Sequence, residues 1–305
     1  MIEKRVSVPI STVWTTNTSP RPIDQLITEE PYRIDVYLAT MSYEDRLQLC
    51  TDNLAQTQLL FNDRVEVLNE ENGWSEIVIP DQPTVKHASG YPGWVPSRQL
   101  TVLNYENNEQ KNVYITSQTA WLYTIQKQRW LHLSFGTTFE VTTAEDDWIR
   151  VRTPLGEGYL KREEASFQLF EKDGTTFLTN ARRFLGLPYL WAGMSGFGFD
   201  CSGFVYRMYK SSGIIIPRDA SNQFQTGITV NETDMEQGDL LYFAYDEGAG
   251  SVHHVAMYAG NGKIIHAPKT GKNVEEIALS GTIYEKELCG VRRYSSSSLW
   301  EMNAS

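Results

Sequence analysis

The 305-residue sequence contains few cysteines, and the three present lie far apart, at Cys50, Cys201 and Cys289. So small and odd a number cannot form a disulfide framework, and at least one thiol must remain unpaired. This usage favours a reducing compartment or a reactive thiol over a disulfide scaffold. No Cys-x-x-Cys pair supports a zinc site, so we expect neither a metal nor another cofactor.

The sequence also lacks long apolar runs and an excess of basic residues. No stretch of about 18 apolar residues occurs, and the N-terminal residues have no apolar core of signal-peptide length. We therefore expect a cytoplasmic monomer that binds no membrane, or a secreted protein if a signal sequence has been removed. The net charge of −11 disfavours attraction to nucleic acid, so no nucleic-acid partner is expected.

The first half of the chain contains an internal repeat. Two blocks match residue for residue, each with an apolar-acidic-apolar triplet, a tryptophan and a closing glycine turn: Val65-Glu66-Val67, Trp74 and Gly93-Trp94-Val95 in one, Phe139-Glu140-Val141, Trp148 and Gly158-Tyr159-Leu160 in the other. Apolar and polar residues alternate in both copies, which is the period of half-buried strands. We expect two small β-barrels in tandem, over residues 1–100 and 101–166.

The first barrel is expected to carry a helical insertion at about residues 42–60. Leucines are spread among polar residues in this segment, and Ser42 with Asp45 has the pattern of a helix N-terminal cap. A barrel needs no helix at this place, so we interpret the insertion as a lid or a brace between domains.

From residue 167 to residue 305 the pattern indicates helices followed by strands. The expected elements are helices at 175–185 and 201–212, a strand at 239–243 and a hairpin at 253–268. Helices that precede an antiparallel sheet define an α+β domain.

A cysteine begins the second of these helices. Cys201 lies in the first turn, where free backbone N–H groups and the helix dipole favour a thiolate, and Asp200 is placed as the N-cap. Most free cysteines are small packing residues. That interpretation leaves the glycine-rich loop before Cys201 and the histidines after it unexplained, so we favour a thiol nucleophile.

Two histidines flank the turn at residues 259–262. His254 and His266 are an even number of residues apart, which places both on the same face of a hairpin, and equal spacing from Gly260 predicts that they face each other. One can act as general base for a thiol while the other fixes its tautomer. His253 points to the opposite face. A surface hairpin with incidental histidines is the alternative.

Together these motifs resemble the NlpC-type cell-wall cysteine peptidases. The resemblance covers about residues 170–295 and rests on four blocks, Pro188–Gly193, Phe199–Val205, Gly238–Phe243 and His254–Tyr258. Ala192 stands where a glycine is usual. The family implies a papain-like core that cuts murein stem peptides next to γ-D-glutamyl residues. The two barrels resemble bacterial SH3-like domains, and the whole arrangement is most similar to YkfC-type murein-peptide recycling enzymes.

The resemblance implies a role for each member of the site. Cys201 would be the nucleophile, His254 the base and His266 the orienting third residue. Tyr189 would donate to the oxyanion beside the backbone N–H of the nucleophile.

A second group of residues would bind the substrate. Asp219 matches the acidic position that these enzymes use for the free α-amine, and a buried ammonium needs such a carboxylate. A helix N-cap is an equally good interpretation of Asp219. Asp200 and Ser202 could line the same pocket, and Tyr91 is the barrel residue best placed to reach it, unless it only packs in the barrel core.

We therefore expect hydrolysis of the γ-D-glutamyl–diamino acid bond in murein stem peptides with a free N-terminal L-Ala, which releases L-Ala-γ-D-Glu. One alternative is a secreted endopeptidase whose barrels bind intact wall. Others are a non-catalytic wall-binding protein and an acyltransferase on the same core. The sequence leaves open whether the diamino acid is meso-diaminopimelate or lysine.

Overall fold

The computed structural model describes residues 2–102 and 111–295, which separate into two compact units. Unit 1 comprises the chain up to Pro80, with Pro92–Leu169 and Ser195–Phe197; unit 2 comprises Asp81–Tyr91, Phe170–Met194 and the chain from Gly198 onward. The segment 81–91, which connects two strands of unit 1 and includes the first residue of the second strand, thus belongs to unit 2.

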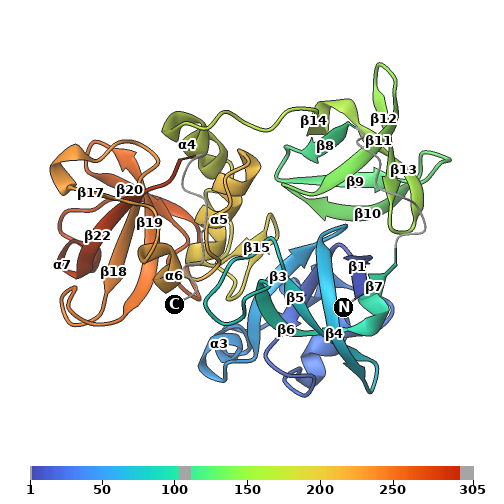
Figure 1. Ribbon diagram of the computed structural model, residues 1–305, viewed down its shortest axis with the longest axis horizontal. Coiled ribbons are helices and arrows are strands. Elements are labelled where there is room, and N and C mark those ends of the chain that lie inside the picture. The colour runs from blue at the N-terminus through green and yellow to red at the C-terminus, as the bar shows by residue number, and fades with distance from the viewer. Residues whose placement is uncertain (1, 103–110, 296–305) are drawn as a thin grey trace. The chain divides into compact units, whose positions relative to one another are not determined.

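Unit 1 contains two antiparallel seven-stranded sheets, each an SH3-like barrel (Figure 1). The strands of the first are β1 (Ile2–Val6), β2 (Ile10–Trp14), β3 (Ala55–Leu60), β4 (Arg64–Glu71), β5 (Trp74–Ile79), β6 (Tyr91–Pro96) and β7 (Leu100–Thr101). The strands of the second are β8 (Asn112–Ile115), β9 (Thr119–Tyr123), β10 (Arg129–Ser134), β11 (Thr138–Ala144), β12 (Trp148–Thr153), β13 (Gly156–Lys161) and β14 (Ala165–Ser166).

The two sheets have the same strand order, which explains the repeat in the sequence. The first runs β3-β2-β6-β5-β4-β1-β7 and the second β10-β9-β13-β12-β11-β8-β14. Even an irregularity is repeated, because the pairing shifts between Val67 and Asn69 in one sheet and between Val141 and Thr143 in the other. Such bulges increase local twist and help a short sheet to curl.

The expected helix at 42–60 is only half correct. Helix α3 spans Tyr43–Thr51, with Ser42 as its N-cap in a reciprocal cap with Asp45, and the chain then turns into strand β3. Asn53 adopts a left-handed backbone conformation with φ 51°, which ends the helix. Two further helices, α1 (Gln25–Thr28) and α2 (Ile34–Thr40), precede α3 in the connection between β2 and β3.

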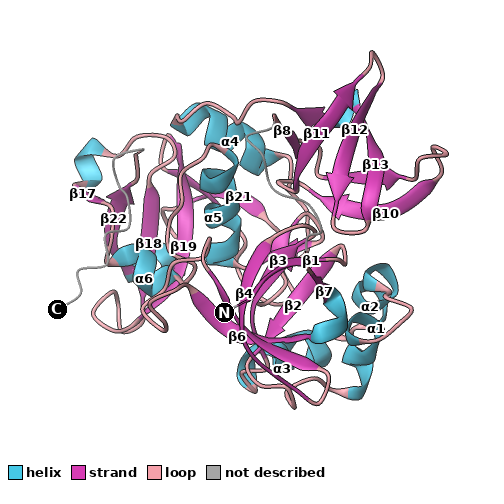
Figure 2. Cartoon of the chain, turned by 45° about the vertical axis from the view of Figure 1, so that its right-hand side comes forward, coloured by secondary structure: helices cyan, strands magenta, loops and turns pink. Residues whose placement is uncertain are grey.

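Unit 2 is an α+β papain-like core (Figure 2). Its helices are α4 (Gly174–Arg182), α5 (Cys201–Ser211), α6 (Ala220–Phe224) and α7 (Ile283–Glu287). Its antiparallel sheet has the order β17 (Ile228–Val230), β22 (Leu288–Arg293), β18 (Leu240–Ala244), β19 (Val252–Gly260), β20 (Lys263–His266) and β21 (Glu275–Ala278). The short strands β15 (Met194–Ser195) and β16 (Gly198–Phe199) precede α5.

Helix α5 lies inside unit 2 and packs on β19 and β20 (Figure 1). The expected inward face is buried, with Phe204, Val205 and Met208 inaccessible to solvent. The opposite face is buried as well, since Tyr206 and Arg207 are covered. The helix is therefore a central element rather than an amphipathic surface helix, and its N-terminus is held in place by packing on all sides.

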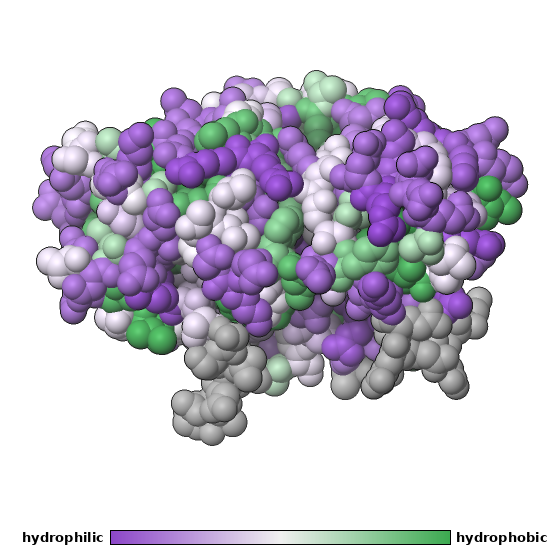
Figure 3. Space-filling view, turned by 90° about the horizontal axis from the view of Figure 1, so that it is seen from above, coloured by the Kyte–Doolittle hydropathy of each residue, from purple (hydrophilic) through white to green (hydrophobic). Residues whose placement is uncertain are grey.

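The surface view in Figure 3 shows hydrophilic side chains over most of one face, with apolar residues in small separate groups. Across the described residues, every helix is too short or too polar to span a bilayer.

Candidate active site

Cys201 occupies the first residue of α5, where the chain leaves the glycine-rich loop. The Asp200 carboxylate caps the helix by accepting from the Gly203 N–H at 2.7 Å, as the sequence predicts. The loop and helix approach so closely that a Cβ on Gly203 would lie 2.2 Å from the Gly193 carbonyl oxygen. Ala192, in the position where glycine is usual, has a left-handed φ of 64°.

The environment of Cys201 keeps its side chain protonated in the free site. Burial, followed by the negative charge of Asp200, raises the pKa of the Cys201 thiol to about 12. Hydrogen bonds from the Val255 and Ser202 N–H groups act in the opposite direction but are outweighed. The N–H groups at the helix start thus favour a thiolate as expected, but burial opposes it more strongly, and the thiol needs a base to ionise it.

His254 and His266 form a directly hydrogen-bonded pair. His254 Nε2 and His266 Nδ1 are 2.7 Å apart, and both rings are buried. Burial holds the pKa of His254 well below its usual value, and burial alone lowers the pKa of His266 to about 4. The Val255 N–H donates a hydrogen bond to the Cys201 sulfur. Because Val255 directly follows His254, this bond places the thiol close to His254 in space. Both imidazoles are thus neutral at pH 7 and can accept a proton.

The two histidines share a face as predicted, but the predicted register is wrong. Met257 pairs with Ile265 and Tyr258 with Ile264, and the pairing then shifts before Gly260 pairs with Lys263. The turn is centred between Asn261 and Gly262 rather than on Gly260, so His254 and His266 meet diagonally rather than directly across the hairpin. Residues two positions out of register are still within reach of aromatic side chains.

Aromatic rings surround the imidazole pair. Tyr284, on α7, stacks on His254 at 5.0 Å between ring centroids and meets the edge of His266 at 4.9 Å. Phe243 stacks on His254 from β18 at 5.7 Å. Nothing in the spacing of the sequence connects Tyr284 to the site, because α7 comes from a segment with no recognisable motif.

A buried ion pair supports the start of α5. Arg218 Nη2 donates to Asp200 at 2.6 Å, and Arg218 Nη1 donates to the Ser202 hydroxyl at 2.8 Å. Asp200, Ser202 and Arg218 are nearly inaccessible to solvent. These contacts give Asp200 and Ser202 a structural function, and a substrate contact from either stays a prediction. Sequence reasoning did not identify Arg218.

A second polar cluster surrounds Asp219, which directly follows Arg218 in the chain. The Tyr91 hydroxyl donates to Asp219 Oδ1 at 2.9 Å, and Lys86 Nζ lies 3.1 Å from Asp219 Oδ2. Lys86 also donates to the Tyr91 hydroxyl and lies 4.3 Å from the centre of that ring. Asp219 stands at the N-cap position of α6 but makes no side-chain cap bond. Asp219 is thus the N-cap by position, as the alternative expected, but its side chain binds Lys86 and Tyr91 instead of capping the helix.

Tyr189, the predicted oxyanion donor, is buried beside the approach to Cys201. It forms an isolated bridge with Phe199, and its N–H donates to the Lys272 carbonyl at 2.9 Å. This places Tyr189 next to strand β16, two residues before the nucleophile. Its role stays a prediction.

A thiol at a buried helix start and a neutral imidazole pair on a neighbouring hairpin define a papain-like thiol site. The NlpC/P60 family model matches residues 186–293, and the model of the YKFC SH3b2 domain matches residues 115–167. The chain belongs to the NlpC/P60 family.

Several relatives match over nearly their whole length. A gamma-D-glutamyl-L-lysine dipeptidyl-peptidase of Bacillus subtilis is 44% identical over 93% of this chain and 96% of its own. A protein of the same name from Bacillus cereus is 38% identical over 95% and 90%. The crystal structure of an NlpC/P60 family protein from Bacillus cereus is similar with a TM-score of 0.91, at 36% identity, over 96% of this chain and 99% of that chain.

Proposed function

We propose that this protein is a cysteine peptidase that hydrolyses the γ-D-glutamyl–diamino acid bond of short murein peptides with a free N-terminal L-Ala. The names of its full-length relatives support the bond that is cut. The observation that carries the requirement for a free amine is the Asp219 carboxylate. It already binds one ammonium, that of Lys86, and accepts a hydrogen bond from Tyr91.

The first half of the reaction forms an acyl-enzyme. His254 takes the thiol proton of Cys201 through Nδ1, since its Nε2 is occupied by His266. The thiolate attacks the γ-carbonyl carbon of D-Glu, and the oxyanion forms beside the Cys201 backbone N–H at the start of α5, with Tyr189 as the second donor. His254 then returns the proton to the leaving amine of the diamino acid, and the C–N bond breaks.

The second half of the reaction hydrolyses the thioester. His254 removes a proton from water, which attacks the same carbonyl carbon, and the Cys201 sulfur leaves and regains the proton from His254. The product is L-Ala-γ-D-Glu with its γ-carboxyl restored. The neutral imidazole pair suits this exchange because the same nitrogen must accept a proton in each half-reaction.

The test is product analysis by mass spectrometry. The substrates are L-Ala-γ-D-Glu-L-Lys, its meso-diaminopimelate equivalent and the N-acetylated form of each. The wild type is expected to release L-Ala-γ-D-Glu from the free-amine peptides, and Cys201→Ala to release none. Asp219→Asn is expected to lose most of the preference for the free amine. Comparison of the two free-amine peptides gives the preference for the diamino acid.

Each other outcome favours a different function. Equal cleavage of free and acetylated peptides would remove the proposed role of Asp219 and indicate an endopeptidase that acts on intact wall. Transfer of the acyl group to an added amine with little hydrolysis would indicate an acyltransferase. Absence of any turnover would favour a binding protein.

A further inference from the structure

The hydrogen-bond pattern of the histidine pair dictates where each ring carries its proton. For His254 to accept a proton at Nδ1, its neutral ring must hold hydrogen on Nε2. That hydrogen is then donated across the 2.7 Å contact to His266 Nδ1. His266, which is also neutral, must therefore hold its own hydrogen on Nε2.

The His266 Nε2–H that results has no hydrogen-bond acceptor among the described residues. The ring is completely inaccessible to solvent, and Nε2 is a buried nitrogen without a partner. Buried donors in folded proteins are almost always paired, so an orphaned donor at the end of a catalytic chain requires an explanation.

Glu275 provides the nearby acceptor. Its Oε1 atom lies 3.6 Å from His266 Nε2, slightly beyond hydrogen-bond range. Glu275 sits on β21 directly opposite His266 on β20. Its side chain is 44% exposed, so it has room to rotate without disturbing packed neighbours.

We propose that Glu275 is a positioning residue that completes a chain from Cys201 through His254 and His266. When the thiol proton moves to His254, the imidazole pair gains a positive charge. The carboxylate is then drawn to His266 Nε2–H, closes the hydrogen bond and stabilises the charged pair. No proton needs to reach Glu275, because its charge and its acceptor oxygen are sufficient.

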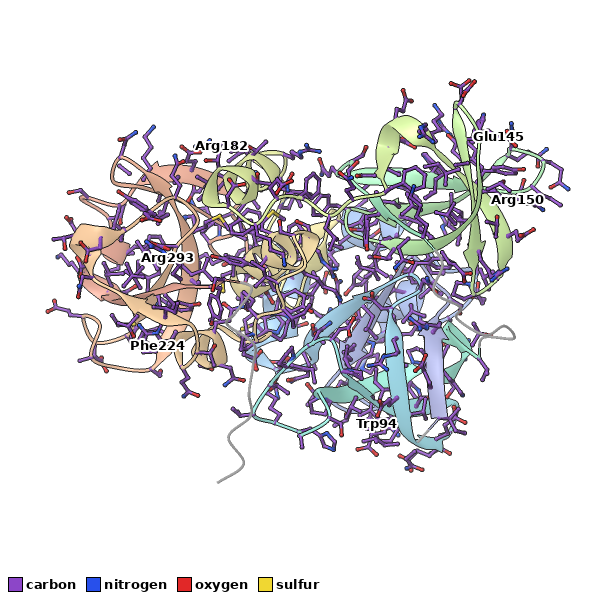
Figure 4. The ribbon with its side chains drawn as sticks, turned by 45° about the horizontal axis from the view of Figure 1, so that its top comes forward. Trp94, Glu145, Arg150, Arg182, Phe224 and Arg293 are labelled. Carbon is purple, nitrogen blue, oxygen red and sulfur yellow. The ribbon has the colours of Figure 1, made fainter. Side chains whose placement is uncertain are left out.

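The other charged and titratable groups around the pair do not serve this purpose. Tyr284 packs on both rings from α7 and stays neutral, because burial raises its pKa to about 12. Glu287 on the same helix is engaged by His253 of β19 at 3.1 Å. Among the described residues, the remaining groups are the Cys201 thiol and Glu276, which lies next to Glu275 on β21. Glu276 accepts from Arg182 of α4 at 2.8 Å; Arg182 is labelled in Figure 4.

Glu276 offers a matched control, since it is the adjacent carboxylate on the same strand. We would compare wild type with Glu275→Gln, Glu275→Ala and Glu276→Gln. Two pH profiles are measured for each: the rate of Cys201 alkylation by iodoacetamide and kcat for L-Ala-γ-D-Glu-L-Lys. Thermal melting verifies that each variant is folded.

For Glu275→Gln we expect both rates at neutral pH to fall about two- to fivefold, the range for a half-exposed charge, and the acid limb to move to lower pH. Glu275→Ala should lose more, because it also lacks the acceptor oxygen. Glu276→Gln should match wild type. Folded Glu275 variants that keep wild-type rates and profiles would overturn the proposal, as would an equal effect of Glu276→Gln.

This inference rests on the proposed thiol chemistry but not on the choice of peptide. Alkylation needs no peptide, so an alkylation profile that responds to Glu275 would support the inference even if the murein peptide were not cleaved. If the wild type cleaves the peptide normally and the Glu275 variants behave like wild type, the role of Glu275 would be overturned, but the proposed function would stand.

Discussion

At the scale of single residues, the site works through neutral groups. Burial raises the pKa of Cys201 and lowers the pKa of His254, so the free site holds a thiol and an imidazole rather than an ion pair. In the proposed reaction, charge separates when the thiol attacks its target, and the surrounding groups then determine how much this costs. An interaction that favours the charged pair therefore acts mainly on the transition state.

Lys86 is the residue whose replacement should improve the enzyme. Its ammonium contacts the Asp219 carboxylate, and in the proposed function the α-amine of the substrate has to displace it. Because Lys86 is 40% exposed, the pair is weak, and Lys86→Met should raise kcat/KM for the free-amine peptide by about two- to fivefold. Steady-state kinetics with the N-acetylated peptide provide the control. A fall in kcat/KM would instead mean that Lys86 contacts the substrate directly.

The candidate residues differ in how far the sequence could identify them. Cys201, His254 and His266 stand in motifs with fixed spacing, so local pattern was enough to select them. Arg218, Lys86 and Glu275 contact the site through pairings that no local pattern encodes. Their importance depends on which distant segments the fold brings together, and the local patterns of one sequence do not show this.

At the scale of secondary-structure elements, the start of α5 depends on one buried carboxylate with two functions. Asp200 caps the helix and neutralises Arg218, whose guanidinium is inaccessible to solvent. Asn keeps the capping oxygen but not the charge, so Asp200→Asn isolates the ion pair. Removing one partner of a buried pair leaves an uncompensated charge and typically costs about 3–5 kcal/mol.

We therefore expect Asp200→Asn to lower the free energy of unfolding by about 3–5 kcal/mol in urea titrations. Asp173→Asn is the matched control, because Asp173 caps α4 from an exposed position, through Thr176. Its cost should remain below about 1 kcal/mol, since Asn and Asp are similar caps. Equal losses in the two variants would mean that the ion pair contributes little.

The sequence pattern predicted the kinds of elements better than their boundaries and strand register. The repeat predicted two barrels because its strands alternate, and the sheets have identical strand orders. The extension of α3 to residue 60 failed because Leu59 and Leu60 suit a buried strand as well as a helix. The predicted hairpin register failed because the turn is centred between Asn261 and Gly262 rather than on Gly260, and the run of turn residues at 259–262 does not reveal which centre is used.

At the scale of the whole molecule, the neutral histidines make stability depend on pH. Unfolding exposes His254 and His266, which regain ordinary pKa values near 6.5. The unfolded chain therefore binds more protons than the folded one between about pH 6.5 and the lowered folded values, about 4 for His266. In that window stability rises with pH, and it is lost as the pH falls.

Each histidine should contribute a slope of up to about 1.4 kcal/mol per pH unit in the free energy of unfolding. Urea titrations from pH 4.5 to 8 would measure the slope. His266→Asn removes one of the two contributions, so its curve should be shallower below pH 6.5 and parallel to wild type above pH 7. Parallel curves throughout would mean that His266 is protonated in the folded protein.

The assignment of residues 81–91 to unit 2 has a consequence for how the gene can be divided. Lys86 and Tyr91 are encoded within the first barrel, yet both side chains meet Asp219 of the peptidase core. A truncated enzyme that begins at Phe170 would retain the thiol and both histidines but lose these two residues. Under the proposed function, division at this boundary would keep the residues of the thiol chemistry but remove part of the group that we propose reads the free N-terminus, so a recombined enzyme is expected to have broader specificity.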